Sequence, residues 1–357
     1  MKSKKFLKEY LNAYAPVAQE SEGQNIWVKY VKQFTDDVTI DPYGTAVARV
    51  KSNTRVVNTH KVVIEAHCDE IAWIVTNVEE SGMIRVKRHG GSDNMIAPSM
   101  PVVIHTHKGT RVDGVFGWPA VHTREKYTMM GPDQHELWID TGLENKEAVT
   151  AAGVEVGNLV TFTTQFGELG DYYIGRSLDN KIGGYIIAEV LRKLDENNNG
   201  LPFDLYVVNS VQEEVGLYGA KKIAKEIKAD LALVHDVCHN TNTPKMDKSK
   251  DGDTKGGLGP CLEYTAQNHR KINSMLRDVA ENAGIPLQLT VGSYGNDTMA
   301  FFLENTATAI LATPLKYMHT TVEMAHKQDV KNAIELFYQF LLNIKPEWID
   351  EVNNKRK

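Results

Sequence analysis

Ser210-Val211-Gln212-Glu213-Glu214-Val215-Gly216-Leu217-Tyr218-Gly219 is the stretch from which the fold can be worked out. It follows the apolar run 203–209, whose β-branched and aromatic residues predict a buried strand. In open α/β sheets, sites form at the carboxyl end of such a strand. Two adjacent glutamates there have two interpretations. One carboxylate holds a metal while its neighbour faces a metal-bound water, or the pair opens a helix over 220–228, where acidic residues favour the N-terminus. This stretch alone does not choose between them.

The composition is that of an ordinary globular protein, with 357 residues, of which 42% are hydrophobic and 24% charged. This length allows a large core and two domains. The net charge of −6 gives no reason to expect a nucleic-acid partner. No run has the length of a transmembrane helix, and the charged N-terminus lacks the apolar core of a signal peptide. The three cysteines are few and odd in number, unlike a disulfide framework. This predicts a reducing compartment, most simply the cytoplasm.

Predicted strands and helices alternate along most of the chain, which indicates an α/β fold with a mixed, mostly parallel central sheet flanked by helices. The exception is 71–166, where short β-patterned runs separated by glycine-rich or polar turns predict an inserted β-barrel-like domain. The catalytic domain is then discontinuous, formed by 1–70 and 167–357. Helices are expected over 5–14, 24–35, 182–196, 271–283 and 328–343, strands over 61–66, 231–236, 287–291 and 309–312, and a loop over 240–259.

Further polar residues occur at the downstream ends of predicted strands or in the loops that follow them. Besides the glutamate pair, they are His67-x-Asp69, Asp179-Asn180, Asp236 and His319. This set is too dispersed for a local metal finger, but it suits a site built from several strand ends at the rim of a sheet.

Imidazoles and carboxylates in this combination can bind two divalent metal ions. Two ions bridged by one carboxylate clamp a water between them at about 3.5–4 Å separation and polarise a substrate carbonyl. Nitrogen and oxygen ligands without thiolate suit Zn²⁺, Co²⁺ or Mn²⁺. Asp69 suits a carboxylate that orients the imidazole of His67.

Each residue alone also has an ordinary structural explanation. His67 is explained as a core histidine, Asp69 as a turn former, and Asp179 as the N-cap of the next helix. Asp236 is explained as an Asx turn and His319 as part of a surface loop. Chance is nevertheless a poor explanation for all of them occurring in this order.

In this order the residues resemble those of the tetrahedral (TET-type) cocatalytic metallo-aminopeptidases, a family also known as glutamyl aminopeptidases or cellulase M homologues. The resemblance extends over nearly the whole chain. The matching segments are Ala66-His67-Cys68-Asp69-Glu70-Ile71, Gly175-Arg176-Ser177-Leu178-Asp179-Asn180-Lys181, Val211-Gln212-Glu213-Glu214-Val215-Gly216, Val234-His235-Asp236-Val237 and His319-Thr320-Thr321-Val322-Glu323-Met324.

The resemblance implies two divalent metal ions per subunit, Zn²⁺ or Co²⁺ with Mn²⁺ as a third option. Asp179 is implied to bridge both ions, with His67 and Asp236 completing one site and Glu214 and His319 the other.

The resemblance also implies two catalytic residues, the general base Glu213 and the orienting residue Asp69. Elementary chemistry agrees with the division of the glutamate pair. A carboxylate bound to a cation is held ionised and transfers protons poorly, so the unbound neighbour must do the transfer.

The function implied is that of a dinuclear-metal-dependent aminopeptidase acting on short peptides, as a homo-oligomer of dimers assembled into a dodecamer. The inserted domain would lie at the interfaces and gate the substrate. Two alternatives remain. The cellulase label points to a glycosidase, which needs paired carboxylates but not this histidine set. A non-catalytic scaffold that kept the fold is the other, although the complete ligand set argues against it.

Some segments depart from the family pattern. The usual histidine–serine–proline turn is His319-Thr320-Thr321, the glycine-rich threonine–aspartate segment is Gly292–Thr298, and Val115–His122 lacks paired prolines. These changes affect the expected specificity more than the expected catalysis. Cys68 and Cys238 lie near ligands in the sequence, either as thiolate ligands or as small buried hydrophobes.

Overall fold

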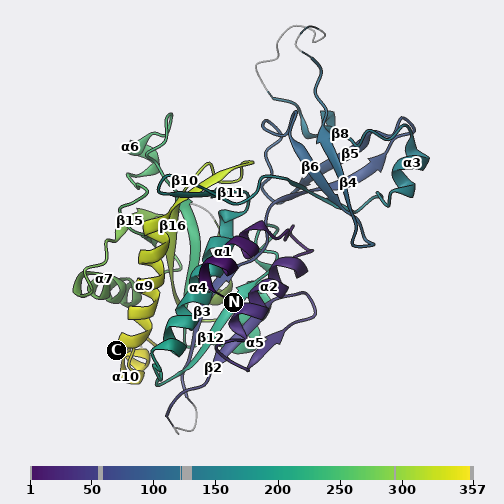
Figure 1. Ribbon diagram of the computed structural model, residues 1–357. Coiled ribbons are helices and arrows are strands. Elements are labelled where there is room, and N and C mark those ends of the chain that lie inside the picture. The colour runs from purple at the N-terminus through teal and green to yellow at the C-terminus, as the bar shows by residue number, and fades with distance from the viewer. Residues whose placement is uncertain (1, 55–58, 121, 123–130, 293–294, 354–357) are drawn as a thin grey trace.

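An eleven-stranded mixed sheet forms the body of the protein in the computed structural model, which describes residues 2–54, 59–120, 122, 131–292 and 295–353 (Figure 1). Its centre consists of parallel strands in the order β12 (Asp204–Ser210), β3 (Lys61–His67), β13 (Leu231–His239) and β16 (Ala307–Lys316). The mixed α/β class predicted from the sequence is confirmed, with the parallel strands at the centre.

Antiparallel strands extend the sheet on both sides. Beyond β12 lie β2 (Ala46–Val50) and β1 (Val38–Ile40). Beyond β16 lie β17 (Glu323–His326), β11 (Tyr172–Gly175) and β10 (Gly167–Leu169). A branch leaves β16 through β14 (Cys261–Tyr264), which pairs in parallel with β15 (Gln288–Val291).

Helices cover both faces of the sheet, so the central strands are buried on both sides. Val62, Val63 and Ile64 of β3 are fully buried in succession, which is typical of parallel strands and differs from the alternation of a half-exposed sheet. One face packs against α1 (Ser3–Asn12), α2 (Ser21–Val31), α4 (Leu178–Glu196), α7 (Arg270–Asn282), α9 (Lys327–Asn343) and α10 (Pro346–Asn353). The other packs against α5 (Tyr218–Ile227) and α8 (Thr298–Leu303).

A closed antiparallel barrel stands beside the sheet (Figure 1). Its strands are β4 (Ala72–Val78), β5 (Ile84–His89), β6 (Pro101–His105), β7 (Arg111–Phe116), β8 (Trp138–Asp140) and β9 (Leu159–Phe162), with α3 (Lys146–Ala151) at its side. It has its own core, in which the rings of Trp73 and Phe116 pack edge to face with their centroids 5.3 Å apart. The barrel-like insertion was therefore predicted correctly, while its limits at 71 and 166 stay a prediction.

Several elements differ from the sequence-based expectation. Strand β13 continues three residues beyond Asp236, so this residue lies inside the strand and not at its end. Strands β14 and β17 and helix α8 were not expected, and α6 (Lys248–Asp251) interrupts the segment 240–259, which was expected to be a loop. Within the described residues, no helix has the length and apolarity to cross a bilayer.

Candidate metal centre

The residues selected from the sequence meet at one edge of the central sheet. His67 is the last residue of β3, and Asp236 lies in the adjacent strand β13. Glu213 and Glu214 follow β12, which pairs with the other side of β3. Asp179 lies at the start of α4, and His319 lies in the turn between β16 and β17. Parallel strands place their carboxyl ends together, so residues far apart in the sequence become neighbours.

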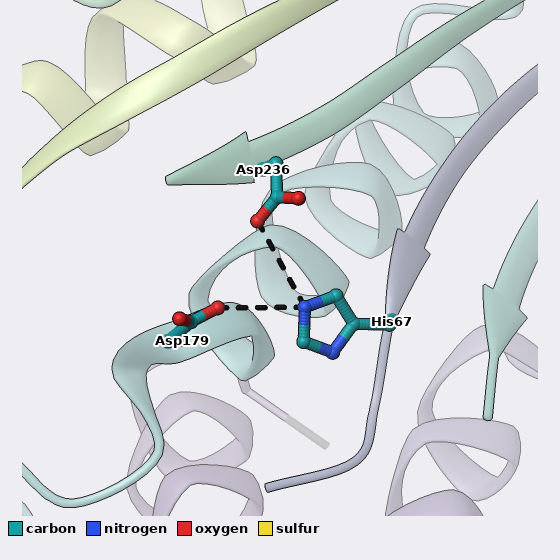
Figure 2. A group of neighbouring side chains, drawn as sticks. All are labelled: His67, Asp179 and Asp236. Atoms are coloured by element: carbon teal, nitrogen blue, oxygen red, sulfur yellow. Dashed lines mark ion pairs between the residues drawn. The ribbon is translucent and has the colours of Figure 1, made fainter. Parts of the chain in front are cut away.

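His67, Asp179 and Asp236 form the first group of possible metal ligands, each carried by a different element (Figure 2). The Nε2 atom of His67 lies 3.4 Å from Asp179 Oδ1 and 3.8 Å from Asp236 Oδ1. All three ligand atoms lie within 4.8 Å of one another. The three side chains thus converge on a space that one cation can fill.

Asp179, Glu214 and His319 form the second group. The Nε2 atom of His319 lies 3.2 Å from Asp179 Oδ2 and 3.1 Å from Glu214 Oε1. Asp179 therefore belongs to both groups and presents a different oxygen to each histidine. Its backbone has extended and not helical dihedral angles, and the peptide bond to Asn180 is cis.

The two adjacent glutamates point to different groups. Glu214 contacts His319, whereas Glu213 Oε2 lies 4.0 Å from His67 Nε2 and is outside both groups of three ligands. Helix α5 begins only at Tyr218, four residues after Glu214. The helix-start interpretation is therefore wrong, because neither carboxylate is in the first turn of α5.

Asp69 connects the segment that carries Glu213 and Glu214 to His67. Its Oδ1 accepts a hydrogen bond from the backbone N–H of Glu213 at 3.0 Å, and its Oδ2 accepts one from Glu214 at 3.1 Å. Asp69 Oδ1 also lies 3.5 Å from His67 Nδ1, whose other close neighbour is the Asp69 carbonyl oxygen at 3.3 Å. The side chain is fully buried. One carboxylate therefore holds the backbone of both glutamates and the ring of His67.

Glu323 is a second buried carboxylate of this kind, and the sequence assigned it no role. Its Oε2 accepts a hydrogen bond from the backbone N–H of Asp179 at 3.1 Å, and its Oε1 accepts one from His319 at 2.9 Å. It is 2% exposed and lies at the start of β17. Glu323 thereby fixes the distance between two residues of the second group. The sequence signals were its position four residues after His319 and its place in the matching segment that begins at His319.

Replacing Glu323 by glutamine is expected to lower metal affinity or activity by about 10- to 100-fold, the usual effect of losing a partner that orients ligands. The amide can accept one of the two backbone hydrogen bonds but presents a donor to the other. Metal titration and kcat/KM measure the effect. The circular dichroism spectrum should match that of the wild type, and unchanged metal affinity and turnover together would contradict the role of Glu323.

A loop of the barrel reaches the second group. A Cβ atom at Gly91 would lie 2.2 Å from His319 Nδ1, so only glycine leaves room for this ring. At the neighbouring Gly90, φ is +84°, a left-handed conformation that glycine adopts easily. The inserted barrel thus packs directly against one of the predicted ligands.

Negative charge is concentrated and buried at this edge of the sheet. Burial raises the pKa of Glu213, Glu214 and Asp236 above their usual range, and neighbouring carboxylates raise it further. Burial also acts to raise the pKa of Asp179, but hydrogen bonds with the two histidines lower it. In the described part of the chain, no lysine or arginine forms an ion pair with these carboxylates. Their partners are the two histidines, which suits a site made for cations.

The donor chemistry also fits divalent metals. Both groups consist of imidazole and carboxylate, the ligand types of Zn²⁺, Co²⁺ and Mn²⁺ sites. All three cysteines are buried free thiols. Cys238 packs with Cys261 and Ala312, and Cys68 is fully buried in the main core. Of the two explanations for Cys68 and Cys238, the structure supports small buried side chains, since neither belongs to a group of possible ligands.

An open cleft of about 590 Å³ gives access to both groups. Besides the predicted ligands and Glu213, its walls include Val237, Glu263, Asn296, Ile310 and Met318. Gly295 and Asn296 of the cleft wall belong to the segment Gly292–Thr298, which departs from the family pattern. Ser293 and Tyr294 of that segment lie outside the described residues, and so does Val121 of the segment Val115–His122.

Comparison with known proteins shows that the chain is a peptidase, a hydrolase that acts on peptide bonds. It belongs to the M42 glutamyl aminopeptidase family, whose sequence pattern matches residues 44–336. The predicted family is thereby confirmed, and membership implies divalent metal ions.

Three relatives show how far the similarity extends. A putative aminopeptidase FrvX of Escherichia coli is 31% identical over 98% of both chains. A lysyl aminopeptidase of Pyrococcus furiosus is 29% identical over 90% of this chain and 92% of its own. The solved structure of the Pyrococcus horikoshii TET1 peptidase, which can assemble into a tetrahedron or a large octahedral shell, has a TM-score of 0.85 and 26% identity, and the match covers 96% of this chain and 100% of that one.

Proposed function

We propose that this protein is a dinuclear-metal-dependent aminopeptidase that removes N-terminal residues from short peptides. The observation that carries the proposal is the position of Asp179, whose two carboxylate oxygens face two different histidines in two groups of ligands. A single carboxylate shared in this way is the arrangement that a pair of adjacent cations requires. Family membership supplies the aminopeptidase activity.

In this proposal His67, Asp179 and Asp236 hold one divalent ion, and Asp179, Glu214 and His319 hold the other. When bound, the two ions supply Lewis-acid polarisation of the substrate carbonyl and lower the pKa of the attacking water. Zn²⁺ or Co²⁺ is the proposed occupant, with Mn²⁺ as a further option.

Glu213 is the proposed general base. Its carboxylate lies beside the first group without being one of its ligands, so it is free to take up a proton. In the proposed reaction it removes a proton from the attacking water and delivers it to the leaving amine. Asp69 acts through Glu213, because it holds the backbone N–H groups of the glutamate pair and thereby aims both side chains.

Two alternatives make different predictions for metal removal. A glycosidase uses paired carboxylates as acid and nucleophile or base and needs no metal. A non-catalytic scaffold has no turnover in either state. The buried histidine–carboxylate groups favour the metallopeptidase over both.

Chelation is therefore expected to abolish hydrolysis of aminoacyl-p-nitroanilides, and adding back Zn²⁺, Co²⁺ or Mn²⁺ should restore it. The physical reason is that both the polarised carbonyl and the activated water depend on the bound ions. Initial rates on metal-stripped and reloaded protein measure the effect. Cleavage of cellulose that resists the chelator would support the glycosidase instead, and absence of turnover in every metal-loaded sample would support the scaffold.

The proposed assembly is a homododecamer built from dimers, with the inserted barrel at the interfaces and near the entrance for substrate. The support is the Pyrococcus horikoshii TET1 peptidase, which can form a tetrahedron. The cytoplasmic location expected from the cysteines stays a prediction. The preferred N-terminal residue is not carried over from the relatives, because glutamyl in the family name and lysyl in the Pyrococcus furiosus relative point to different side chains.

A further inference from the structure

Glu263 is a buried carboxylate in the wall of the cleft that the catalytic scheme does not use. It lies in β14 and is 3% exposed. Within the described residues, its side-chain oxygens have no hydrogen bond or ion pair, although its backbone carbonyl accepts one from Asn268. Burial raises the pKa of Glu263 to about 7. A carboxylate held in such surroundings without a partner is costly, and a cation placed beside it removes that cost.

The sheet register fixes how far Glu263 is from the metal ligands. Glu263 is opposite Ile310 of β16, which is opposite Val234 of β13. Asp236 is two residues further along β13 and on the same side of the sheet. With strands about 4.8 Å apart and a rise of about 3.4 Å per residue, the Cα atoms of Glu263 and Asp236 are about 12 Å apart. Glu263 is therefore distant from Asp236 and belongs to neither group of possible ligands, yet it lines the same cleft.

The cleft wall between Asp236 and Glu263 is apolar. Ile310 lines the cleft between Asp236 and Glu263, and Cys238, Cys261 and Ala312 form a small buried cluster next to it. Glycine at position 292 leaves room for the carboxylate, because a Cβ atom there would lie 2.7 Å from Glu263 Oε2. The cleft thus offers an apolar path that ends at a carboxyl group.

The carboxyl group of Glu263 disfavours an acidic substrate side chain at this end of the cleft. Among its described lining residues there is no lysine or arginine. The histidines that line the cleft are His67 and His319 of the two ligand groups and His239. An acidic side chain that reached Glu263 would meet a second carboxyl group there, and like charges at short range are unfavourable. A lysine side chain has the complementary form, with a four-carbon stem to pack on Ile310 and an ammonium group for the carboxylate.

We propose that Glu263 is the specificity-determining residue of this cleft and selects peptides whose N-terminal residue is lysine or arginine. The inference rests on the proposed aminopeptidase function. In the bound state, the basic side chain extends from the metal ligands along Ile310, and its cationic end pairs with Glu263. The cation favours the ionised form of the carboxyl group, so binding and ionisation support each other.

The test compares kcat/KM for lysyl-, arginyl-, leucyl- and glutamyl-p-nitroanilide on the metal-loaded full-length protein. The wild type should favour the lysyl and arginyl substrates over the leucyl one. Glu263→Gln should lower the ratio of lysyl to leucyl kcat/KM by about 10- to 100-fold, the contribution of a hydrogen bond to a charged group. Glu304→Gln, the same chemical change at an exposed position, should leave this ratio as it is in the wild type. Glu263→Lys provides a second variant and should favour the glutamyl substrate over the lysyl one.

Three results would overturn the inference. An unchanged ratio in Glu263→Gln, with active enzyme, rejects Glu263 as a specificity residue and leaves the proposed function standing. An equal decrease for the lysyl and leucyl substrates assigns Glu263 to a structural role or to binding of the α-amine. Absence of hydrolysis of every substrate by the metal-loaded wild type would reject the proposed function, and this inference with it.

Discussion

Replacing Asp179 by asparagine is expected to remove both metal ions and to lower kcat/KM by a factor of about 10³ or more, because metal ions supply several kcal/mol of transition-state stabilisation. Asp179 is the only residue common to both groups in the described part of the chain, and each of its oxygens faces a different histidine. Asparagine keeps the shape of the side chain but loses the charge and one of the two oxygens. A single substitution should therefore affect both groups at once.

Metal content by atomic emission and kcat/KM on one aminoacyl substrate measure this effect. Asp195→Asn is the matched control, because Asp195 lies on the same helix, α4, but is exposed to solvent. That variant should behave as the wild type in both measurements. Two ions per chain retained by the Asp179→Asn protein would contradict the shared-ligand assignment.

The second large effect is expected at Glu213. Glu213→Gln should lower kcat by about 10²- to 10⁴-fold, the contribution of a well-placed general acid–base residue, without loss of metal. Metal content should not change because Glu213 belongs to neither group of ligands. Glutamine has nearly the same size but cannot take up the proton.

The neighbouring residue provides the sharpest comparison. Glu214→Gln is the same substitution one residue away, but Glu214 Oε1 lies 3.1 Å from His319 Nε2 in the second group. This variant should lose metal as well as activity, whereas Glu213→Gln should lose activity alone. Full turnover in Glu213→Gln would reject Glu213 as the base, and equal metal loss in both variants would reject the division of roles between them.

Much of the central sheet was predictable because its strands carry their signal locally. The apolar run 203–209 predicted β12 to within one residue, and 61–66 predicted β3 equally well. Buried parallel strands are continuous apolar runs, and such runs stand out in a sequence. The inserted barrel was predicted for a similar reason, since its short β-patterned segments are separated by turn residues.

The two strands that were missed near the site carry buried glutamates. Strand β14 is Cys261–Tyr264 with Glu263 in the cleft wall, and β17 begins at Glu323, which holds Asp179 and His319. Both strands have only four residues, so one carboxylate removes much of the apolar pattern from which a strand is predicted, whereas β3 was predicted despite the buried Glu65 because three consecutive apolar residues precede it. Departures of this kind are expected where function places polar groups against the local preference.

The sequence by itself determined the class of fold, the family and the set of polar residues at the strand ends, because apolar runs, turn residues and a specific order of motifs are properties of the chain alone. Only the tertiary structure decided which oxygen of Asp179 faces which histidine, that Glu213 stands outside both groups, and that Glu263 and Glu323 are buried beside them. The reason is physical. These relations depend on distances between side chains up to about 250 residues apart, which arise only when parallel strands bring their ends together.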